Sequence, residues 1–265
     1  MTTAIIGAGV MGETLLSGLL RAGVPKSELL IADRRIERSA EVTKEHGVAN
    51  GTNQEVSAKA DTVVLVVKPQ DMAIVLDEIK DSLRPGTLVV SLAAGITTGF
   101  MEDLLPAKTP VIRVMPNTPA LVDQGMAAIS SGTNSTDEHL VTVETLLRSV
   151  GQVVRVPEKY QDAVTAISGS GPAYIFYVVE AMIEGGVMLG LPRDVANELV
   201  LQTVYGAATM LRETKEHPTV LREQVTSPGG TTVAALRQFD DFKVRAAFLS
   251  AMEAARDRSK ELGMQ

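Results

Sequence analysis

Three glycines close to the start of the chain have the spacing of a phosphate-binding turn. Gly7, Gly9 and Gly12 form the pattern G-x-G-x-x-G, with an apolar stretch at residues 3–6 before it and a helical pattern at residues 13–21 after it. In a strand–turn–helix unit of this kind, backbone N–H groups of the turn and of the helix N-terminus bind a pyrophosphate group. Because the motif stands in this context, we predict that the first part of the chain binds a dinucleotide.

The residues that follow the second apolar run bear on which dinucleotide is bound. Asp33 lies 21 residues after Gly12, where an acidic side chain accepts hydrogen bonds from the adenosine ribose of NAD. Arg34, Arg35 and Arg38 follow at once, and arginines in this place bind a 2′-phosphate through charge-assisted hydrogen bonds. The alternative is that these arginines only solvate a loop and the start of a helix. We predict NAD(P)H as the cofactor and favour NADPH, with NADH as the second choice.

Three further segments are predicted to lie at the carboxyl ends of strands, which is where an open parallel sheet binds its ligands. Residues 67–70 place Lys68 beside the ribose and nicotinamide, although a plain turn with an exposed lysine is the alternative. Residues 91–95 are small enough for a flat ring to lie against the backbone. In residues 113–119, two prolines fix the loop, and Asn117 has donors and acceptors for a substrate or a ring amide.

Two segments in the second half of the chain combine glycines with serine or threonine before a predicted helix. They are residues 167–174 and 226–232. Free N–H groups, hydroxyl donors and the positive end of the helix dipole suit an anion such as a carboxylate. Ordinary N-capping is the alternative for either segment alone. Two such segments in one dinucleotide-binding chain favour a small carboxylate substrate.

The pattern along the chain changes near residue 160. Before it, short and almost wholly apolar runs alternate with helical patterns, which predicts a doubly wound, mostly parallel sheet of the Rossmann type. After it, helices are predicted from Pro172, Pro192, Pro218 and Thr231, the last interrupted near residues 240–241. We therefore predict an α/β dinucleotide-binding domain over residues 1–158 and an all-α domain over residues 159–265. Since these helices are apolar on more than one face, we expect the helical domain to bury itself against a second subunit.

The composition is that of an ordinary globular protein, with 45% hydrophobic and 22% charged residues. A net charge of −7 argues against nucleic acid or a membrane surface as the main partner. The absence of cysteine excludes disulfides, thiol catalysis and cysteine-ligated metals. The apolar runs are too short to span a bilayer, and the early glycine motif leaves no room for a signal peptide, so we expect a cytoplasmic protein.

Conventional catalytic groups are scarce in this sequence. His46 and His139 are expected at the surface and His217 just before a helix, away from the segments described above. No spacing of histidines or carboxylates indicates a metal site, and we predict none. A protonated imine accepts a hydride without a strong acid from the protein, so positioning and a hydrogen bond to its nitrogen suffice. The scarcity of acids and bases therefore suits the reduction of an imine.

Several segments together resemble the pyrroline-5-carboxylate reductase family. They are residues 6–9, 67–69, 93–97, 115–119, 168–174, 185–187 with 190–193, and 227–232, in the family's order along residues 4–262. The resemblance implies reduction of Δ1-pyrroline-5-carboxylate to L-proline with NAD(P)H, the last step of proline biosynthesis. It also implies a homodimer formed through the helical domain and assembled into a decamer.

The resemblance further implies roles for single residues. Thr232 is the catalytic candidate, hydrogen-bonded to the ring nitrogen, and we expect it to orient the substrate more than to act as an acid. Together with the patterns above, the predicted substrate-binding residues are Ser227, Gly229, Gly230, Thr231, Thr232 and Asn117. The predicted cofactor-binding residues are Gly7, Ala8, Gly9, Val10, Met11, Gly12, Asp33, Arg34, Asn53, Val67, Lys68, Pro69, Ala93, Ala94 and Gly95.

One segment departs from the family, and two other function classes stay open. Residues 239–245 contain no glycine, whereas the family carries one in the turn before the last helix. Another imine reductase or a β-hydroxyacid dehydrogenase has the same plan, but the dehydrogenase would carry a lysine in the helix at residues 173–189, which has none. The non-enzymatic alternative is a dinucleotide sensor or a pyridoxal-phosphate protein, for which Lys68 is the single loop candidate.

Overall fold

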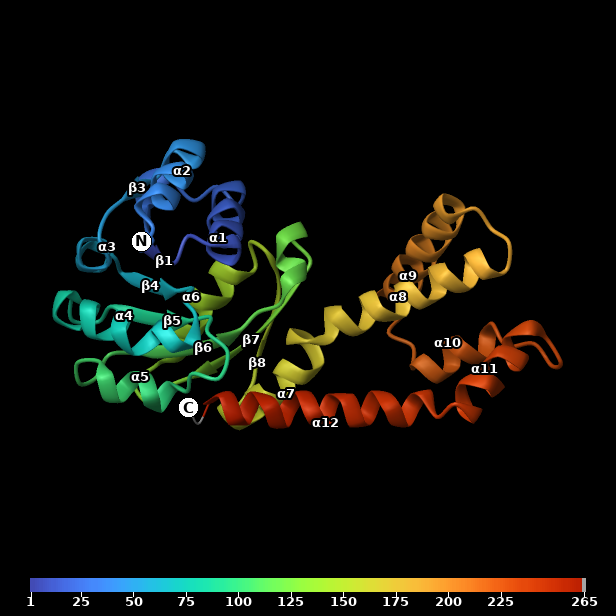
Figure 1. Ribbon diagram of the computed structural model, residues 1–265. Coiled ribbons are helices and arrows are strands. Elements are labelled where there is room, and N and C mark those ends of the chain that lie inside the picture. Colours follow the sequence, from blue (N-terminus) through green and yellow to red (C-terminus); the bar gives the residue numbers. More distant parts are fainter. Residues whose placement is uncertain (264–265) are drawn as a thin grey trace. The chain divides into compact units, whose positions relative to one another are not determined.

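The computed structural model describes residues 1–263 and divides the chain into two compact units (Figure 1). We call the first the sheet unit; it comprises Met1–Ser170 and the end of the chain from Ala255. The second, the helical unit, comprises Gly171–Ala254. The last helix therefore begins in the helical unit and ends in the sheet unit. The predicted domain boundary between residues 158 and 159 lies before this division and stays a prediction.

A single sheet of eight strands forms the centre of the sheet unit, in the order β3-β2-β1-β4-β5-β6-β7-β8. The sequence runs outward from β1 to β3 and then returns to β4 on the other side of β1, which is the doubly wound topology and confirms the predicted fold class. The strands are β1 Thr3–Ile6, β2 Leu29–Ala32, β3 Ala49–Asn50, β4 Thr62–Leu65, β5 Leu88–Ser91, β6 Val111–Met115, β7 Gly125–Ser131 and β8 Gly151–Arg155.

Two features of the sheet have simple physical reasons. Neighbouring strands are parallel except for β6 and β7, which are antiparallel. The connection between these two is residues 116–124, which is shorter than the crossover that a parallel pair requires. Strand β3 is not predicted from the sequence because both of its residues are exposed, so that no apolar run marks it.

Helices cover both faces of the sheet, each over its own buried apolar cluster. Leu16 of α1 and Leu147 of α6 belong to one cluster, with Ile5 of β1. Met72 of α4 and Met101 of α5 belong to the other. The helices are α1 Val10–Arg21, α2 Ile36–His46, α3 Asn53–Lys59, α4 Met72–Ile79, α5 Thr98–Leu104, α6 Asp137–Leu147 and α7 Gln161–Val164, with the short 3-10 turns η1 Lys26–Glu28, η2 Pro69–Asp71, η3 Lys80–Ser82, η4 Thr118–Val122 and η5 Glu158–Tyr160.

The helical unit confirms the helices predicted for the second half of the chain. Pro172 and Pro218 lie in the first turn of their helices, and Pro192 is an N-cap. The predicted interruption near residues 240–241 separates the last two helices, where Lys243 has a φ of 55°. The helices are α8 Gly171–Met188, α9 Arg193–Thr214, α10 Pro218–Gln224, α11 Thr231–Asp241 and α12 Val244–Gly263.

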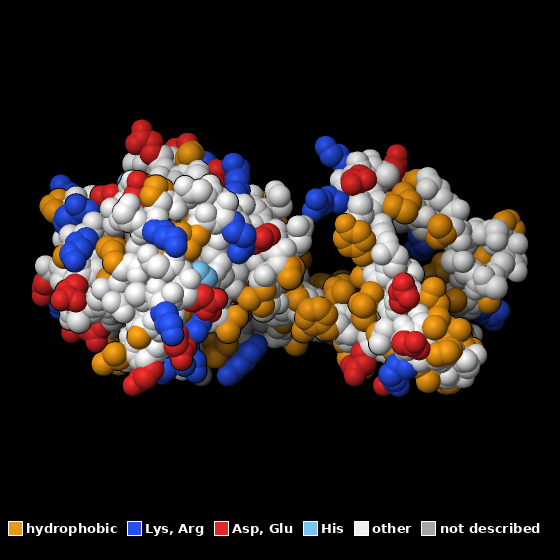
Figure 2. Space-filling view, turned by 90° about the horizontal axis from the view of Figure 1, so that it is seen from above, with side chains coloured by type: hydrophobic (Ala, Val, Ile, Leu, Met, Phe, Trp, Pro, Cys, Tyr) orange, Lys and Arg blue, Asp and Glu red, His pale blue; other side chains and the backbone are white. Residues whose placement is uncertain are grey.

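Large apolar side chains are exposed along the helical unit, as Figure 2 shows for one face. They include Phe176 and Tyr177 of α8 and Tyr205 of α9, each at least 66% exposed. Residues 158–188 form the one helical stretch among residues 1–263 that is long and apolar enough to cross a membrane, by length and composition only. A surface of this kind in an isolated chain marks a site that another apolar surface covers.

Candidate dinucleotide and carboxylate sites

The glycines of the predicted motif shape the turn between β1 and α1. Gly7 has a φ of 104°, and a Cβ atom there would lie 2.3 Å from the carbonyl oxygen of Val66. At Gly12, a Cβ atom would lie 1.9 Å from the carbonyl oxygen of Gly7. Glycine is therefore required at both positions. At Gly9, in contrast, a Cβ atom would meet nothing within 4 Å, which leaves the open space that a closely approaching pyrophosphate needs.

Helix α1 presents unpaired backbone donors beside this space. Gly9 is the N-cap, and the N–H group of Glu13 bonds to its carbonyl oxygen at 2.9 Å. Within residues 1–263, the N–H groups of Val10, Met11 and Gly12 have no hydrogen-bond partner. Three free donors at the positive end of a helix suit the charge of a pyrophosphate. The residues present thus fit the predicted dinucleotide.

Two charged side chains clamp the peptide groups of Ala8 in the same turn. The Ala8 N–H donates to Asp33 Oδ2 at 2.9 Å, and Arg38 Nε donates to the Ala8 carbonyl oxygen at 2.8 Å. Asp33 Oδ1 also accepts the Arg35 N–H at 2.9 Å. Asp33 therefore fixes the turn, a role that the sequence did not reveal. Its predicted contact with the ribose stays a prediction.

The three arginines after β2 differ in how free they are. Arg38 is largely buried and bonds Glu13 and Glu41 as well as Ala8, so it is not available for a 2′-phosphate. Burial opposes its charge, but the hydrogen bonds to Glu13 and Glu41 raise the pKa of Arg38 above its ordinary value. Arg35 pairs with Asp33. Arg34 is 75% exposed, and its ion pair with the carboxylate of Asp71 is long at 3.4 Å, which leaves it as the arginine best able to bind a phosphate.

Glu13 joins α1 to α2 in a small charged cluster. His46 Nε2 lies 3.2 Å from Glu13 Oε1 and is partly buried, so the expectation of an exposed surface histidine is wrong for His46. Glu13, Glu45 and His46 have the spacing to hold a metal ion. Arg38 already neutralises Glu13, however, and argues against a cation there. The prediction that the chain has no metal site stays a prediction.

The other predicted cofactor residues follow the carboxyl ends of β3, β4 and β5, which meet at one edge of the parallel sheet. Lys68 is exposed at the start of η2, next to the partly buried Val67 and the exposed Pro69. Ala93 and Gly95 are buried, and Ala94 between them is partly exposed. Asn53 Nδ2 donates to Glu78 Oε2 at 2.7 Å, so part of its donor capacity is already used. The structure brings these groups to the predicted edge, and their cofactor contacts stay predictions.

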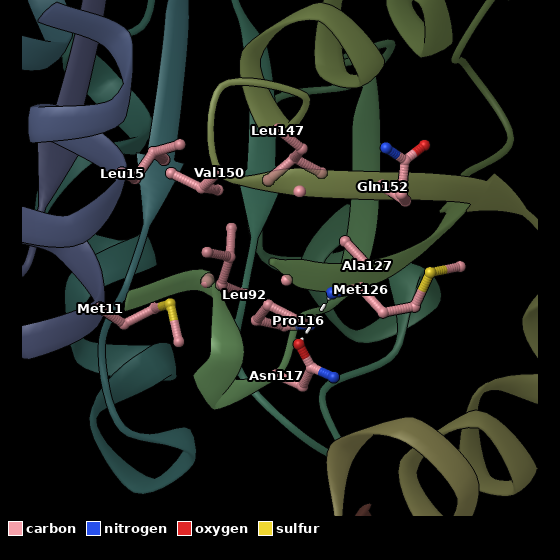
Figure 3. A pocket seen from close by; sticks show the side chains of 13 residues that line it. Met11, Leu15, Leu92, Pro116, Asn117, Met126, Ala127, Leu147, Val150 and Gln152 are labelled. Atoms are coloured by element: carbon pink, nitrogen blue, oxygen red, sulfur yellow. Dashed lines mark hydrogen bonds between the residues drawn. The ribbon is translucent and has the colours of Figure 1, made fainter. Parts of the chain in front are cut away.

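A small apolar pocket with a cavity volume of about 20 Å³ opens at this edge, between α1, η4 and strands β7 and β8 (Figure 3). Met11, Leu92 and Pro116 line it, together with Asn117. Asn117 Oδ1 accepts the Met126 N–H at 2.8 Å, the bond drawn in Figure 3. Asn117 Nδ2 donates to the carbonyl oxygen of Ser168 at 3.1 Å. The side chain predicted to bind substrate therefore already holds two backbone segments, and its substrate contact stays a prediction.

The glycine- and serine-rich segment at residues 167–174 is not the loop that the sequence suggested. It is part of a continuous helix in which α7 passes through a π-helical turn, η6 Thr165–Gly169, into α8. The Ser170 N–H bonds to the carbonyl oxygen of Thr165 at 2.8 Å, so the chain continues the preceding helix here. Pro172 lacks the N–H that would reach Ser168, and Asn117 donates to that carbonyl oxygen instead. The prediction of a loop in this segment is therefore wrong, and the anion site predicted for it stays a prediction.

The second hydroxyl-rich segment does lie at a helix N-terminus. Gly229 has a φ of 68°, and Gly230 is the N-cap of α11 without a side-chain capping bond. A Cβ atom on Gly230 would lie 2.4 Å from Ser227 Oγ, so the hydroxyl group is next to the N-cap backbone. Thr231 is exposed and Thr232 is half-buried at the start of α11. Backbone donors and hydroxyl groups are thus grouped as a carboxylate requires.

One polar group in the sheet was missed by the sequence reasoning. Arg113 is almost fully buried in β6 and pairs with Glu158 and Asp162. A charged residue in the otherwise apolar run at residues 111–115 is a signal that could have identified it, because a buried arginine needs partners. No pattern in the sequence marks Glu158 or Asp162 as those partners.

Two family models match parts of the chain, and a curated relative matches nearly all of it. The model of a family described as "Pyrroline-5-carboxylate reductase dimerisation" matches residues 158–262, and one described as "NADP oxidoreductase coenzyme F420-dependent" matches residues 2–95. A pyrroline-5-carboxylate reductase of Corynebacterium melassecola is 46% identical over 266 residues, covering 99% of this chain and 98% of that protein.

Solved structures give the same result for the fold. A pyrroline-5-carboxylate reductase from Coxiella burnetii superposes with a TM-score of 0.93 at 36% identity, covering 98% of each chain. A pyrroline carboxylate reductase from Plasmodium falciparum, solved with NADP bound, superposes with a TM-score of 0.87 at 30% identity and covers 99% of this chain and 98% of that one.

Proposed function

The chain belongs to the pyrroline-5-carboxylate reductase family, and from that premise we propose that it reduces the imine of Δ1-pyrroline-5-carboxylate to L-proline with NAD(P)H. This is the last step of proline biosynthesis. The observation that carries the proposal is that one chain holds both a dinucleotide turn at β1–α1 and a hydroxyl-flanked helix N-terminus at α11. The first suits a hydride donor and the second a small carboxylate.

We propose NADPH as the preferred cofactor, with NADH as a second substrate. The turn at residues 7–12 would hold the pyrophosphate, and Arg34 would bind the 2′-phosphate. Lys68 and Asn53 would contact the adenosine and ribose groups, and the loop at residues 93–95 would lie against the nicotinamide. The bound cofactor supplies the hydride. The engagement of both Asp33 oxygens by backbone N–H groups supports NADPH, because it leaves this carboxylate less free to receive a ribose diol.

The proposed substrate contacts centre on the start of α11. The carboxylate would accept hydrogen bonds from the first N–H groups of α11 and from the hydroxyl groups of Ser227 and Thr231. The Thr232 hydroxyl would accept a hydrogen bond from the protonated ring nitrogen. Hydride addition to the imine carbon then moves the C=N π electrons onto nitrogen, which gives the amine of proline without a further proton. Thr232 orients the ring and does not need to act as an acid.

The competing functions have less support. Helix α8, Gly171–Met188, contains no lysine, which disfavours a β-hydroxyacid dehydrogenase. Lys68 is exposed, whereas a pyridoxal-phosphate lysine sits in a closed pocket. A dinucleotide sensor would not need the hydroxyl groups at α11.

We also propose that two chains dimerise through the helical unit and that the dimers assemble into a decamer in the cytoplasm. The matched dimerisation family and the exposed side chains of α8 and α9 support the dimer. A second subunit would cover the apolar stretch at residues 158–188, which accounts for it without a membrane. Sedimentation should give a mass twice or ten times the 28.1 kDa of one chain.

A comparison of two cyclic imines tests the proposal at the site that carries it. Δ1-Pyrroline-5-carboxylate and 1-pyrroline share the imine and differ in the carboxylate. We expect the first to be reduced with NADPH, and the second at least tenfold less efficiently in kcat/KM, since charge-assisted hydrogen bonds contribute about 1.5–3 kcal/mol. Equal efficiency would remove the proposed role of α11, and no reduction of either imine would refute the function.

A further inference from the structure

A buried charge in the sheet unit has no part in the proposed reaction. Arg113 points from β6 with 5% of its side chain exposed. Its register neighbours are Ser91 of β5 and Ser130 of β7, both fully buried, so a polar row crosses three strands. A buried guanidinium is costly unless it is paired and hydrogen-bonded. The residues that pair with it are therefore under strong constraint.

Two carboxylates from the segment after β8 pair with this arginine. Glu158 Oε1 lies 3.4 Å from Arg113 Nη1, and Asp162 Oδ1 lies 4.0 Å from Arg113 Nη2. Glu158 also accepts two hydrogen bonds from Thr98, one from the backbone N–H and one from Oγ1, both at 2.7 Å. Thr98 is the first residue of α5. The arginine is thereby connected to the far end of the loop at residues 92–97.

The last turn of α12 packs against the same cluster of Arg113, Glu158 and Asp162. Ser259 is 5% exposed, and its Oγ donates to Asp162 Oδ1 at 2.8 Å. Gly263 meets the loop backbone directly, because a Cβ atom on it would lie 2.7 Å from the carbonyl oxygen of Gly95. The converse holds at Gly95, where a Cβ atom would lie 3.2 Å from the Gly263 nitrogen. The two backbones lie in close contact here, and a side chain at Gly263 would force one of them to shift.

We propose that Glu158 and the last turn of α12 are positioning elements that fix the loop at residues 92–97, the first directly after its last residue and the second at its middle. Glu158 holds the start of α5, and Gly263 supports Gly95. This inference rests on the proposed function, in which Ala94 of that loop lies against the nicotinamide. The proposed site assigns none of these groups a contact with the substrate or the cofactor, so we expect their effect to be on geometry alone.

The proposal predicts a division between binding and chemistry. Most contacts of the dinucleotide in the proposed site are with its adenosine and pyrophosphate groups, so loosening the loop should change the Kd of NADPH by less than threefold. Hydride transfer depends more steeply on position, since a shift of about 1 Å can cost about 100-fold. We expect Glu158→Ala to slow single-turnover hydride transfer about tenfold or more. Glu158→Gln keeps an acceptor for Thr98 and should lose less.

The test measures four variants by the fluorescence of bound NADPH, by its Kd, by single-turnover rate and by thermal unfolding. Glu158→Ala and Glu158→Gln probe the end of the loop, and Gly263→Ala probes its middle in case the first variant does not fold. Glu261→Ala is the matched control, since Glu261 is exposed on the same turn and pairs with Arg258. The chain has no tryptophan, so protein emission does not overlap the nicotinamide signal.

Altered nicotinamide emission and slower transfer at nearly unchanged Kd, in Glu158→Ala or Gly263→Ala but not in the control, support the proposal. Unchanged emission and rate in both would overturn it. A parallel loss of NADPH affinity, transfer rate and thermal midpoint would also overturn it, because a purely structural role has that effect. If the unmodified enzyme binds NADPH but does not reduce the imine, the proposed function fails, while the emission of the variants still decides the positioning role.

Discussion

Replacement of Arg34 by alanine should lower the affinity for NADPH and leave that for NADH unchanged. Arg34 is the most exposed of the three arginines after β2, and its pairing with Asp71 is weak at 3.4 Å. The 2′-phosphate is present in NADPH and absent from NADH. A contact with that phosphate therefore changes the ratio of the two affinities. Contacts that both cofactors share cancel in that ratio.

The structure sets the expected size of this effect. Hydrogen bonds to charged groups contribute about 1.5–3 kcal/mol, and an exposed site with a competing carboxylate lies at the lower end of that range. The Kd for NADPH should therefore rise about 10-fold, at about 1.4 kcal/mol for each factor of ten. Added salt should shrink the difference, because exposed charges are screened.

Fluorescence titration of both cofactors measures the effect, with Arg38→Ala as the contrasting variant. Arg38 bonds the Ala8 carbonyl oxygen and Glu13, so its loss should weaken NADPH and NADH by the same factor. An unchanged NADPH-to-NADH ratio in Arg34→Ala would show that Arg34 is only a solvated surface charge. A changed ratio in Arg38→Ala would show that the assignment of the two arginines is reversed.

Four further outcomes follow from the structure. Gly12→Ala should abolish NADPH binding and destabilise the fold, because its Cβ would lie 1.9 Å from a carbonyl oxygen. Gly9→Ala should fold and only weaken NADPH binding, and calorimetry with NADPH titration distinguishes the two variants. Thr232→Ala should lower kcat about tenfold with an unchanged Kd for NADPH, and Thr232→Ser should recover most of the lost kcat. An equal loss of kcat and of NADPH affinity would refute the role of this hydroxyl group. Lys243→Gly should raise the free energy of unfolding, measured with urea, by about 0.5–1 kcal/mol, because the native φ of 55° strains a lysine. A lower free energy of unfolding in this variant would contradict the prediction. The pKa of Asp61 is lowered mainly by the hydrogen bond from the Thr2 N–H. Burial opposes this shift, and Arg84 adds to it. Its stabilising effect is therefore full above its unfolded pKa of about 4 and is lost as the pH falls through the lower folded value, so Asp61→Asn should cost a few tenths of a kcal/mol at pH 7 and nothing near pH 2.

The sheet and the glycine turn were predictable because their causes are local. Buried parallel strands give apolar runs, and the space around Gly7 and Gly12 admits no side chain, so both leave a mark on the sequence. The prolines likewise mark where the helices of the second half begin. Even the glycine missing from the turn at Lys243 was visible in the sequence, and the structure shows the positive φ that this lysine has to adopt.

The remaining features depend on contacts between distant residues. Residues 167–174 have the composition of a loop. Asn117, 51 residues away in the sequence, donates to the carbonyl oxygen of Ser168, and the segment forms a π-helical turn where a break in the helix was predicted. Asp33 fits the pattern of a ribose ligand, and only the fold shows that Ala8 and Arg35 occupy its oxygens. The partners of Arg113 come from a segment that no periodicity connects with β6.

The most direct test of the proposed reaction is to add Δ1-pyrroline-5-carboxylate to the protein with NADPH, and to follow both the absorbance of the cofactor and the formation of L-proline. The proposed function predicts one proline formed for each NADPH consumed, with a lower rate when NADH replaces NADPH. A folded protein that binds NADPH but forms no proline with either cofactor would contradict it.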